Sequence, residues 1–317
     1  MKWRLTGTAP LPSLPLALPM TTPSRPRDEF ELLIPLALVA LWGQLFYAAV
    51  PIWRFGEYYS FGWFVPPLAI SLFLTRWKKL KGYRLPTTKT YRYILLALVL
   101  LPALGLLRAV EAFDTSWRPA LLLQGVLVVG ASHLLLFWRG GWRLSLGMTP
   151  VTIYALTALP YPWQFEQELI RRLTGLVINI SGELFNVFGR PVHVVGETLE
   201  SMGKTVEVTE GCSGIRSFQN LVMAALFLGE HYLLGWLPRL LLFGMAGVVA
   251  VVANTWRAMT LARISFDQSE DAYHQAHDRI GYISFAAGIA ILVVAAILLS
   301  AAKDRRRGVL KTTITTP

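Results

Sequence analysis

Apolar segments of about 20 residues follow one another along most of this 317-residue chain. A helix needs roughly 20 mostly apolar residues to cross the hydrocarbon core of a bilayer, within a range of about 17–25. Candidate spans lie near 32–51, 60–75, 92–110, 119–138, 144–160, 217–236, 239–258 and 281–301. Only 15% of the residues are charged, whereas soluble domains carry about a quarter. We therefore expect an all-α polytopic membrane protein with about eight transmembrane helices.

Lysine and arginine residues gather in alternate connections between these segments. The two tails, the 76–92 connection, Arg139, Arg143 and Arg239 hold 19 of the 30 basic residues. Because cytoplasmic loops carry an excess of Lys and Arg, we predict that both termini are cytoplasmic. The net charge of +11 then reflects topology, and we expect no nucleic-acid partner. Four prolines interrupt the first apolar stretch, which favours a flexible cytosolic tail over a signal peptide.

Residues 161–216 form the longest stretch outside the predicted spans and make an extracytoplasmic insert. Apolar residues at three- and four-residue steps from Phe165 to Phe188 predict an amphipathic helix at the membrane interface. After it, β-branched runs on both sides of "ESMGK" predict a small β-hairpin with Gly203 in its turn. The second strand of this hairpin leads into Gly211 and Cys212, just before the sixth span.

Cys212 is the only cysteine of the chain and lies at the predicted outer N-terminal end of the sixth span. The N–H groups and positive dipole end of a helix N-terminus lower the pKa of a thiol and increase its thiolate fraction. The seventh span ends with Arg257, and the eighth begins near His274 and His277, on the same side. A thiol, a guanidinium and an imidazole on one surface suit a nucleophile, an anion-stabilising group and a proton carrier.

Each of these residues also has a structural interpretation. A lone cysteine can be a small apolar group, a histidine in an outer loop a solvated surface residue, and an arginine at a span terminus an anchor to the headgroups. Arg216, one helical turn after Cys212, either assists the thiolate or anchors the interface. Asn254 is expected to face protein, because an amide is costly in lipid. Glu230 and His231 fall near the cytoplasmic interface, and we interpret them as structural.

Three motifs follow one another at the outer ends of three consecutive late spans: "EGCSGIRS", "NTWR" and "HDRIG". In this order and spacing they resemble the exosortase/archaeosortase family of membrane cysteine transpeptidases, as does "YYSFGWFVPPLAISLF" early in the chain. The resemblance covers roughly residues 50–300. It implies an endopeptidase of the bacterial cytoplasmic (inner) membrane that cleaves exported proteins through a thioester. The implied substrates carry a C-terminal sorting signal made of a short motif (often Pro-Glu-Pro), a transmembrane helix and a basic tail, and the product passes to an unknown surface acceptor.

Residue by residue, the resemblance implies that Cys212 is the nucleophile, Arg257 the arginine of the N-x-x-R element and His277 the catalytic histidine. His274 takes second place, because it lacks the glycine four residues on that His277 has in Gly281. The residues expected to support the site are Arg216, Asn254, Ser213 and His274.

Two other function classes remain open: a transporter, and a non-enzymatic scaffold for export of envelope polymers. A transporter needs polar residues at mid-membrane, which are sparse here, and a scaffold needs no reactive thiol. We expect no metal or cofactor, since a second cysteine is missing and His274 and His277 lack a clear third ligand. The predicted organisation is a flexible cytosolic tail at 1–30, a polytopic membrane catalytic domain at 31–301 and a basic cytosolic tail at 302–317.

Overall fold

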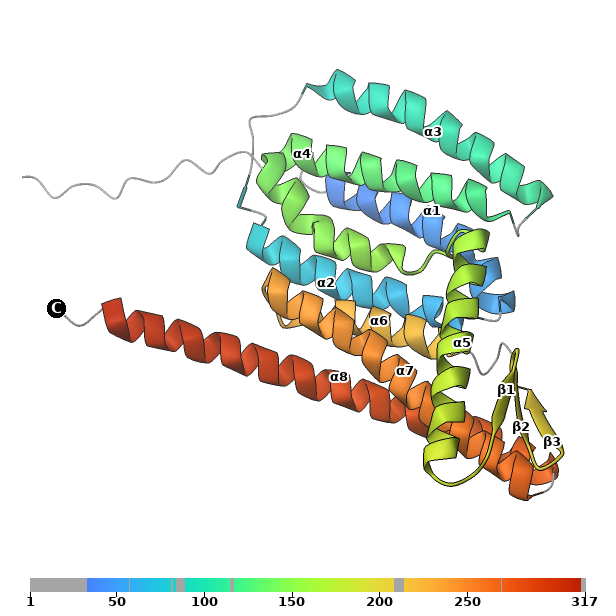
Figure 1. Cartoon of the computed structure of the whole chain (residues 1–317). Helices are drawn as coiled ribbons and strands as arrows, with labels where there is room; N and C mark the ends of the chain where they lie inside the picture. The colour runs from blue at the N-terminus through green and yellow to red at the C-terminus, as the bar shows by residue number, and fades with distance from the viewer. Residues whose placement is uncertain are drawn as a thin grey trace, which may run out of the picture.

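The computed structural model describes residues 33–56, 58–80, 82–83, 89–114, 117–207, 214–268 and 270–314. Its helices are α1 (Leu33–Phe55), η2 (Ser60–Phe64), α2 (Val65–Leu80), α3 (Thr90–Phe113), α4 (Arg118–Leu156), α5 (Trp163–Val187), α6 (Ile215–His231), α7 (Trp236–Asp267) and α8 (Glu270–Ile314). The long helices run side by side in one bundle, except α5, which lies across one end of it next to a small sheet (Figure 1). The predicted all-α polytopic fold is therefore confirmed. The predicted tail at 1–30 lies outside the described residues, and α8 continues into the predicted tail at 302–317.

Five helices of the described chain are long and apolar enough to cross a membrane: α1, α3, α4, α7 and the part of α8 from Asp271 to Lys303. With 16 and 17 residues, α2 and α6 are shorter. The structure thus supports a multi-pass membrane protein without showing the predicted eight spans. Each of the eight predicted segments nevertheless overlaps a helix of the described chain.

The long helix α4 accounts for two of the predicted segments. At Gly140 and Gly141 the backbone leaves the helical conformation, and Gly141 has a φ of 66°. Glycine adopts a positive φ without steric cost, so this pair permits a sharp turn. The two halves of α4 then run antiparallel to each other (Figure 1).

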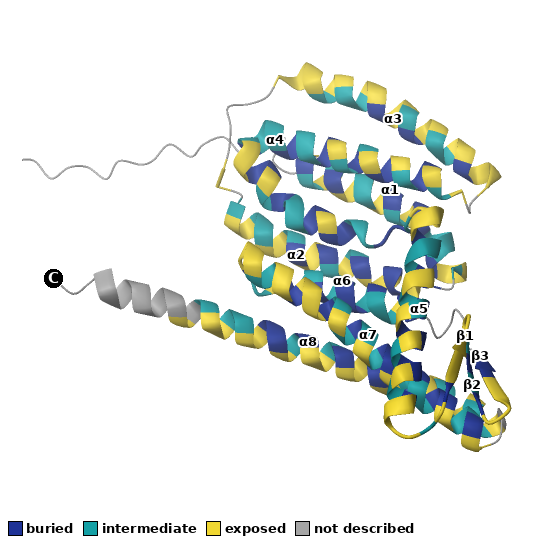
Figure 2. Cartoon of the chain, viewed as in Figure 1, coloured by how far each residue is buried: buried dark blue, intermediate teal, exposed yellow. Residues whose placement is uncertain are grey.

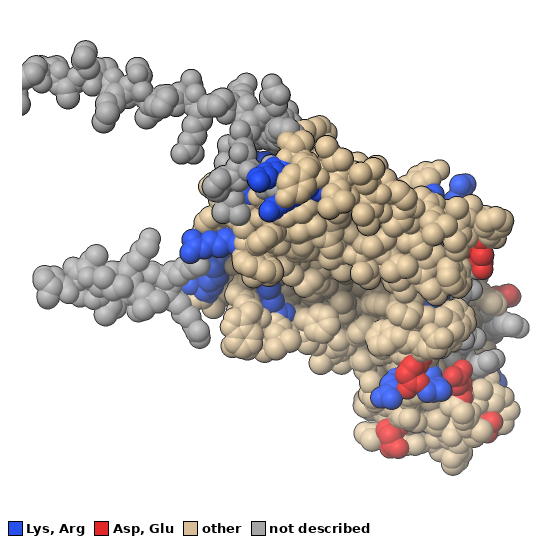
Figure 3. Space-filling model, turned by 90° about the horizontal axis from the view of Figure 1, so that it is seen from above, with Lys and Arg blue, Asp and Glu red and all other residues tan. Residues whose placement is uncertain are grey.

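The two ends of the bundle differ in charge. The basic end contains the turn of α4, the end of α2 and the 232–235 connection between α6 and α7. The opposite end, which we call the α5 end, holds α5 and the sheet. On the face seen in Figure 3, the acidic side chains of the described residues lie toward the α5 end. The described basic residues near the basic end include Arg76, Lys78, Lys79, Arg139, Arg143 and Arg239.

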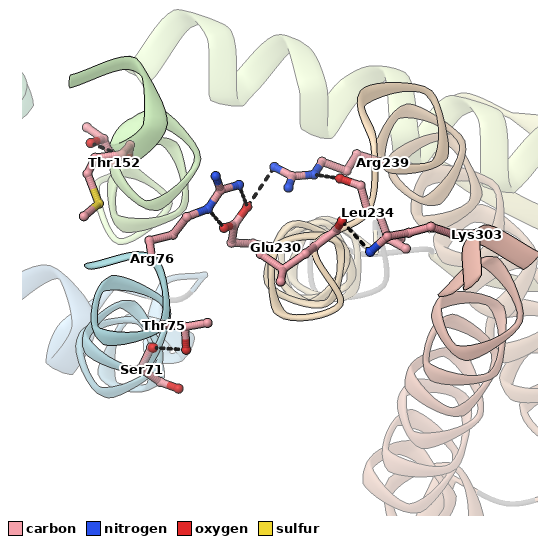
Figure 4. A network of polar contacts seen from close by, with 10 residues as sticks. Ser71, Thr75, Arg76, Thr152, Glu230, Leu234, Arg239 and Lys303 are labelled. Atoms are coloured by element: carbon pink, nitrogen blue, oxygen red, sulfur yellow. Dashed lines mark hydrogen bonds and ion pairs between the residues drawn. The ribbon is translucent and has the colours of Figure 1, made fainter. Parts of the chain in front are cut away.

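A buried carboxylate and a lysine near it tie four helices together at the basic end (Figure 4). Glu230 of α6 accepts hydrogen bonds from Nε and NH2 of Arg76 on α2, and it lies 2.8 Å from NH1 of Arg239 on α7. Lys303 of α8 donates to the two carbonyl groups that follow α6, at 3.2 and 3.0 Å. These contacts agree with the structural interpretation of Glu230.

The bundle has a buried apolar core and also exposes apolar side chains on its outside, as membrane proteins do. Side chains of α1, α2, α4 and α6 make the main core, with Leu45, Leu72 and Tyr154 almost fully buried (Figure 2). In contrast, α3 packs against α4 and is exposed along most of its length. Apolar exposed side chains on such a helix are stable where lipid surrounds them.

Polar contacts inside the bundle link α1, α3 and α4. Glu111 of α3 is buried and accepts hydrogen bonds from Arg108 at 2.6 Å and from Gln124 of α4 at 3.0 Å. Gln124 in turn accepts a hydrogen bond from Gln44 of α1 at 2.7 Å. Glu111 is two residues before the end of α3 and Gln124 six residues after the start of α4, so this network lies near the α5 end of the bundle.

The predicted amphipathic helix is α5, and its buried side is partly polar. The buried positions combine the polar Glu166 and Ser181 with apolar residues such as Phe185. Most of the apolar positions that predicted the helix are only half-buried or exposed. Phe165 and Phe188, at the two ends of that apolar stripe, are both exposed. This arrangement suits a helix at the interface that turns part of its apolar stripe toward lipid.

A buried ion pair fixes the beginning of α5. Glu166 accepts a hydrogen bond from NH2 of Arg118 at 2.9 Å and another from the hydroxyl of Tyr59, which precedes η2. Arg118 also donates to the carbonyl of Tyr161 at 3.0 Å. Burial raises the pKa of Tyr59 above its ordinary value, and the hydrogen bond to Glu166 raises it further. This cluster connects the N-terminal ends of α4 and α5 to the segment before α2.

The sheet after α5 has three antiparallel strands, so the prediction of a two-stranded hairpin was incomplete. The strands are β1 (His193–Val195), β2 (Thr198–Ser201) and β3 (Lys204–Glu207), in that order. The predicted turn joins β2 to β3, with φ values of 50° at Met202 and 79° at Gly203. A second tight turn at Gly196, with a φ of 60°, adds β1. Two-residue turns with positive φ match the twist of paired strands.

Candidate active site

Arg257 and His277 meet at the α5 end of the bundle. Arg257 lies on α7 and His277 on α8, and the guanidinium NH2 is 3.0 Å from Nε2 of the imidazole. Nδ1 of the same ring lies 3.0 Å from Oδ1 of Asp278. The structure therefore brings together two of the three residues predicted to be catalytic.

These two contacts determine which ring nitrogen of His277 carries the proton. A guanidinium only donates hydrogen bonds, so Nε2 must accept the bond from Arg257. The proton of the neutral ring then lies on Nδ1, where it is donated to the carboxylate of Asp278. In this arrangement His277 is a neutral base whose lone pair points toward Arg257.

Gly281 makes room for the guanidinium. It lies four residues after His277 on α8, and a Cβ added there would be 3.6 Å from Nε and 3.7 Å from Cζ of Arg257. Such distances are ordinary van der Waals contact, so the guanidinium lies directly over the glycine. The glycine that distinguishes His277 from His274 in the sequence thus lies against Arg257, where a methyl group would also fit and a larger side chain would not.

Asn254 joins the beginning of α6 to this part of α7. It is buried, as expected, and packs against Gly214, the residue before α6. Gly214 has a φ of 80°, and a Cβ there would lie only 2.6 Å from Cγ of Asn254. Only glycine fits this position without a shift. Since Asn254 precedes Arg257 by about one helical turn, the start of α6 meets α7 next to the Arg257–His277 pair.

The remaining predicted residues are divided between the exposed surface and the part of the chain that is not described. Cys212 and Ser213 lie outside the described residues. Arg216 is exposed in the first turn of α6, and His274 is exposed with its ring against Tyr273. The structure does not bring either of these side chains to the Arg257–His277 pair.

Two neighbours of His277 were not singled out from the sequence. Asp278 follows it directly, and Tyr273 lies one helical turn before it, with ring centroids 6.0 Å apart. For Tyr273 the four-residue spacing on a helix was the available signal. For Asp278 the only signal was adjacency, which on a helix does not by itself indicate contact.

Comparison with known proteins gives one match. The family model described as transmembrane exosortase (Exosortase_EpsH) matches residues 53–294, which is more than half of the chain. No curated protein and no solved structure matches it. The matched region contains α2 to α7, most of α8 and the Arg257–His277 pair. The chain belongs to the transmembrane exosortase family.

Proposed function

We propose that this protein is a membrane cysteine transpeptidase in which Cys212, Arg257 and His277 act together. The observation that carries the proposal is the 3.0 Å contact between the guanidinium of Arg257 and Nε2 of His277. It joins two residues that are 20 positions apart in the chain. The family resemblance had implied, from two separate motifs, that both of them are catalytic. Membership in the exosortase family supports the same chemistry.

The position of Gly214 supports a place for Cys212 in the same site. Gly214 packs against Asn254, about one helical turn from Arg257, and Cys212 is two residues before Gly214 in the chain. Two residues of extended chain reach at most about 7 Å. The proposal therefore requires that residues 212 and 213 run from Gly214 toward Arg257 and His277, so that the sulfur atom lies next to this pair.

The proposed reaction begins with proton transfer from the thiol of Cys212 to Nε2 of His277. The resulting imidazolium can only donate, so it can no longer accept the hydrogen bond from Arg257. The released guanidinium then stabilises the oxyanion that forms when sulfur attacks the peptide carbonyl. Collapse of this intermediate breaks the C–N bond, and the imidazolium gives its proton to the leaving amine. An acceptor nucleophile or water then attacks the thioester and regenerates the thiol.

The proposed substrates are exported proteins with a C-terminal sorting signal. Their transmembrane helix would lie beside the bundle, with the short motif at the depth of Cys212 and the basic tail at the basic end. In this proposal the α5 end faces outward from the bacterial cytoplasmic membrane and both termini are cytoplasmic. The tails and connections assigned to the cytoplasmic side hold 19 of the 30 Lys and Arg residues, which supports this orientation.

Co-expression with a tagged substrate tests the assignment. Cys212→Ala and His277→Ala should abolish processing, and Arg257→Ala should lower it by about 10²–10³-fold, which is the range for loss of one oxyanion donor. His274→Ala is the matched control, since His274 is exposed three residues before His277 and should be dispensable. Full processing by Cys212→Ala would refute the nucleophile. Activity lost in His274→Ala but kept in His277→Ala would reverse the histidine assignment.

A further inference from the structure

A mostly apolar groove of about 790 Å³ lies between α5 and α7 at the α5 end. Ile180 and Leu184 of α5 and Phe188, which follows this helix, form one wall, and Val252 and Met259 lie on the opposite wall. Phe188 and Val252 are exposed, by 74% and 62%. Exposed apolar side chains of a membrane protein are stable against lipid, so the groove opens toward lipid.

The groove does not open onto the Arg257–His277 pair. Its α7 wall includes Trp256, Met259 and Arg263, whereas Arg257 points to α8, where it contacts His277. Successive residues of a helix are turned by about 100°, so these two sets lie on different sides of α7. An occupant of the groove is thus separated from the proposed reaction by the helix itself.

The groove ends in a positively charged mouth. Arg190 donates from NH1 to both carboxylate oxygens of Asp267, at 2.9 and 3.0 Å. Arg263 lies 3.8 Å from the same carboxylate and exposes 78% of its side chain. Two guanidinium groups share one carboxylate, which leaves one net positive charge. Because Arg263 is largely exposed, a singly charged phosphodiester can accept hydrogen bonds from it and balance this positive charge.

The length and lining of the groove suit a lipid. From Val251 to Asp267 the α7 wall is about 24 Å long at ~1.5 Å per residue, close to one leaflet with its headgroups, which is half of about 40–45 Å. Mostly apolar side chains line this length, and Arg190, Arg263 and Asp267 lie at its end. An apolar wall that ends in charged groups matches acyl chains joined to a charged headgroup.

We infer that the α5–α7 groove binds a phospholipid with a net negative headgroup, its acyl chains between the two helices and its phosphate at Arg263. The bound lipid joins the C-terminal part of α5 to α7. The inference does not depend on the chemistry of Cys212, so it is tested on the Cys212→Ala protein.

The test is thermal unfolding of purified Cys212→Ala protein in a nonionic detergent, with dioleoyl phosphatidylglycerol as the probe. Phosphatidylglycerol should raise the unfolding temperature in a saturable way, and inorganic phosphate or diacylglycerol at the same concentration should not. Arg263→Gln should weaken the apparent affinity about tenfold, since a charge-assisted hydrogen bond contributes about 1.5–3 kcal/mol and 1.4 kcal/mol is tenfold. Val252→Phe should weaken it by filling the apolar part of the groove, because Val252 is exposed there.

Arg171→Gln is the matched control. Arg171 is also a highly exposed arginine (74%) paired with a carboxylate of its own helix, and it does not line the groove. It should leave the affinity unchanged. Equal weakening by Arg171→Gln and Arg263→Gln would overturn the inference, because it would show a general charge effect. An affinity unchanged by Val252→Phe, or an equal shift with diacylglycerol or inorganic phosphate, would overturn it as well.

Discussion

Replacement of Glu166 by alanine should destabilise the protein strongly, although Glu166 takes no part in the proposed reaction. Its side chain is only 1% exposed and pairs with Arg118, which is 18% exposed. Removing one partner of a buried ion pair costs about 3–5 kcal/mol, because the other charge stays buried without compensation. Arg118 keeps its hydrogen bond to the carbonyl of Tyr161. We therefore expect the lower end of that range, about 3 kcal/mol.

Glu168→Ala is the matched control on the same helix. Glu168 is 36% exposed, and its partners Arg171 and Arg172 are 74% and 79% exposed. Ion pairs in solvent contribute little, so this variant should lose less than about 1 kcal/mol. Both variants are compared by thermal unfolding in detergent, where about 3 kcal/mol corresponds to a decrease on the order of 10 °C. Limited proteolysis should also show α5 released in Glu166→Ala alone. Equal losses in the two variants would refute the reasoning from burial.

Three further outcomes are expected. Gly281→Ala should keep processing within about twofold, because its Cβ only touches the Arg257 guanidinium. Gly281→Leu should displace the guanidinium and lower processing at least about tenfold, with a loss of stability of about 1–3 kcal/mol; processing by Gly281→Leu equal to that of Gly281→Ala would contradict this. Glu230→Ala should cost about 3–5 kcal/mol of unfolding free energy, because it removes the only carboxylate that Arg76 and Arg239 contact among the described residues; an unchanged unfolding temperature would contradict this. Since the pKa of Tyr59 is raised in the folded state, its contribution to stability should be full below pH 10.0 and decrease as the pH rises above it. Between about pH 9 and 11, Tyr59→Phe should therefore show a flatter fall in unfolding temperature than the wild type, and parallel curves would exclude the effect.

Much of the bundle could be predicted because apolar length is a strong constraint in a bilayer. The segment "WRGGWR" separated two predicted spans, and the structure turns there at Gly140 and Gly141. The buried side of α5 could not be predicted in the same way. In water an apolar stripe faces the core, but at a membrane part of the stripe, such as Phe165, can face lipid while Glu166 and Ser181 are buried against protein. The β-branched run before "ESMGK" was predicted as one strand, and the turn at Gly196 that divides it into β1 and β2 was not predicted.

The candidate site was predictable in outline and not in its contacts. Charge patterning and the ends of the spans put Arg257 and His277 on one side of the membrane. The direct contact between them depends on how α7 and α8 pack, with Gly281 beneath the guanidinium. The contact with Asp278 fixes the tautomer, and no spacing rule for helices predicts it.

Capture of the acyl-enzyme tests the central proposal most directly. Protein co-expressed with a tagged sorting-signal substrate is denatured in acid, digested and analysed by mass spectrometry. We expect the N-terminal part of the substrate to be attached through its new carboxyl end to the peptide that contains Cys212, and hydroxylamine to release it. The adduct should accumulate in the wild type and be absent from Cys212→Ala. Processed substrate in Cys212→Ala, or an adduct on another residue, would contradict the proposal.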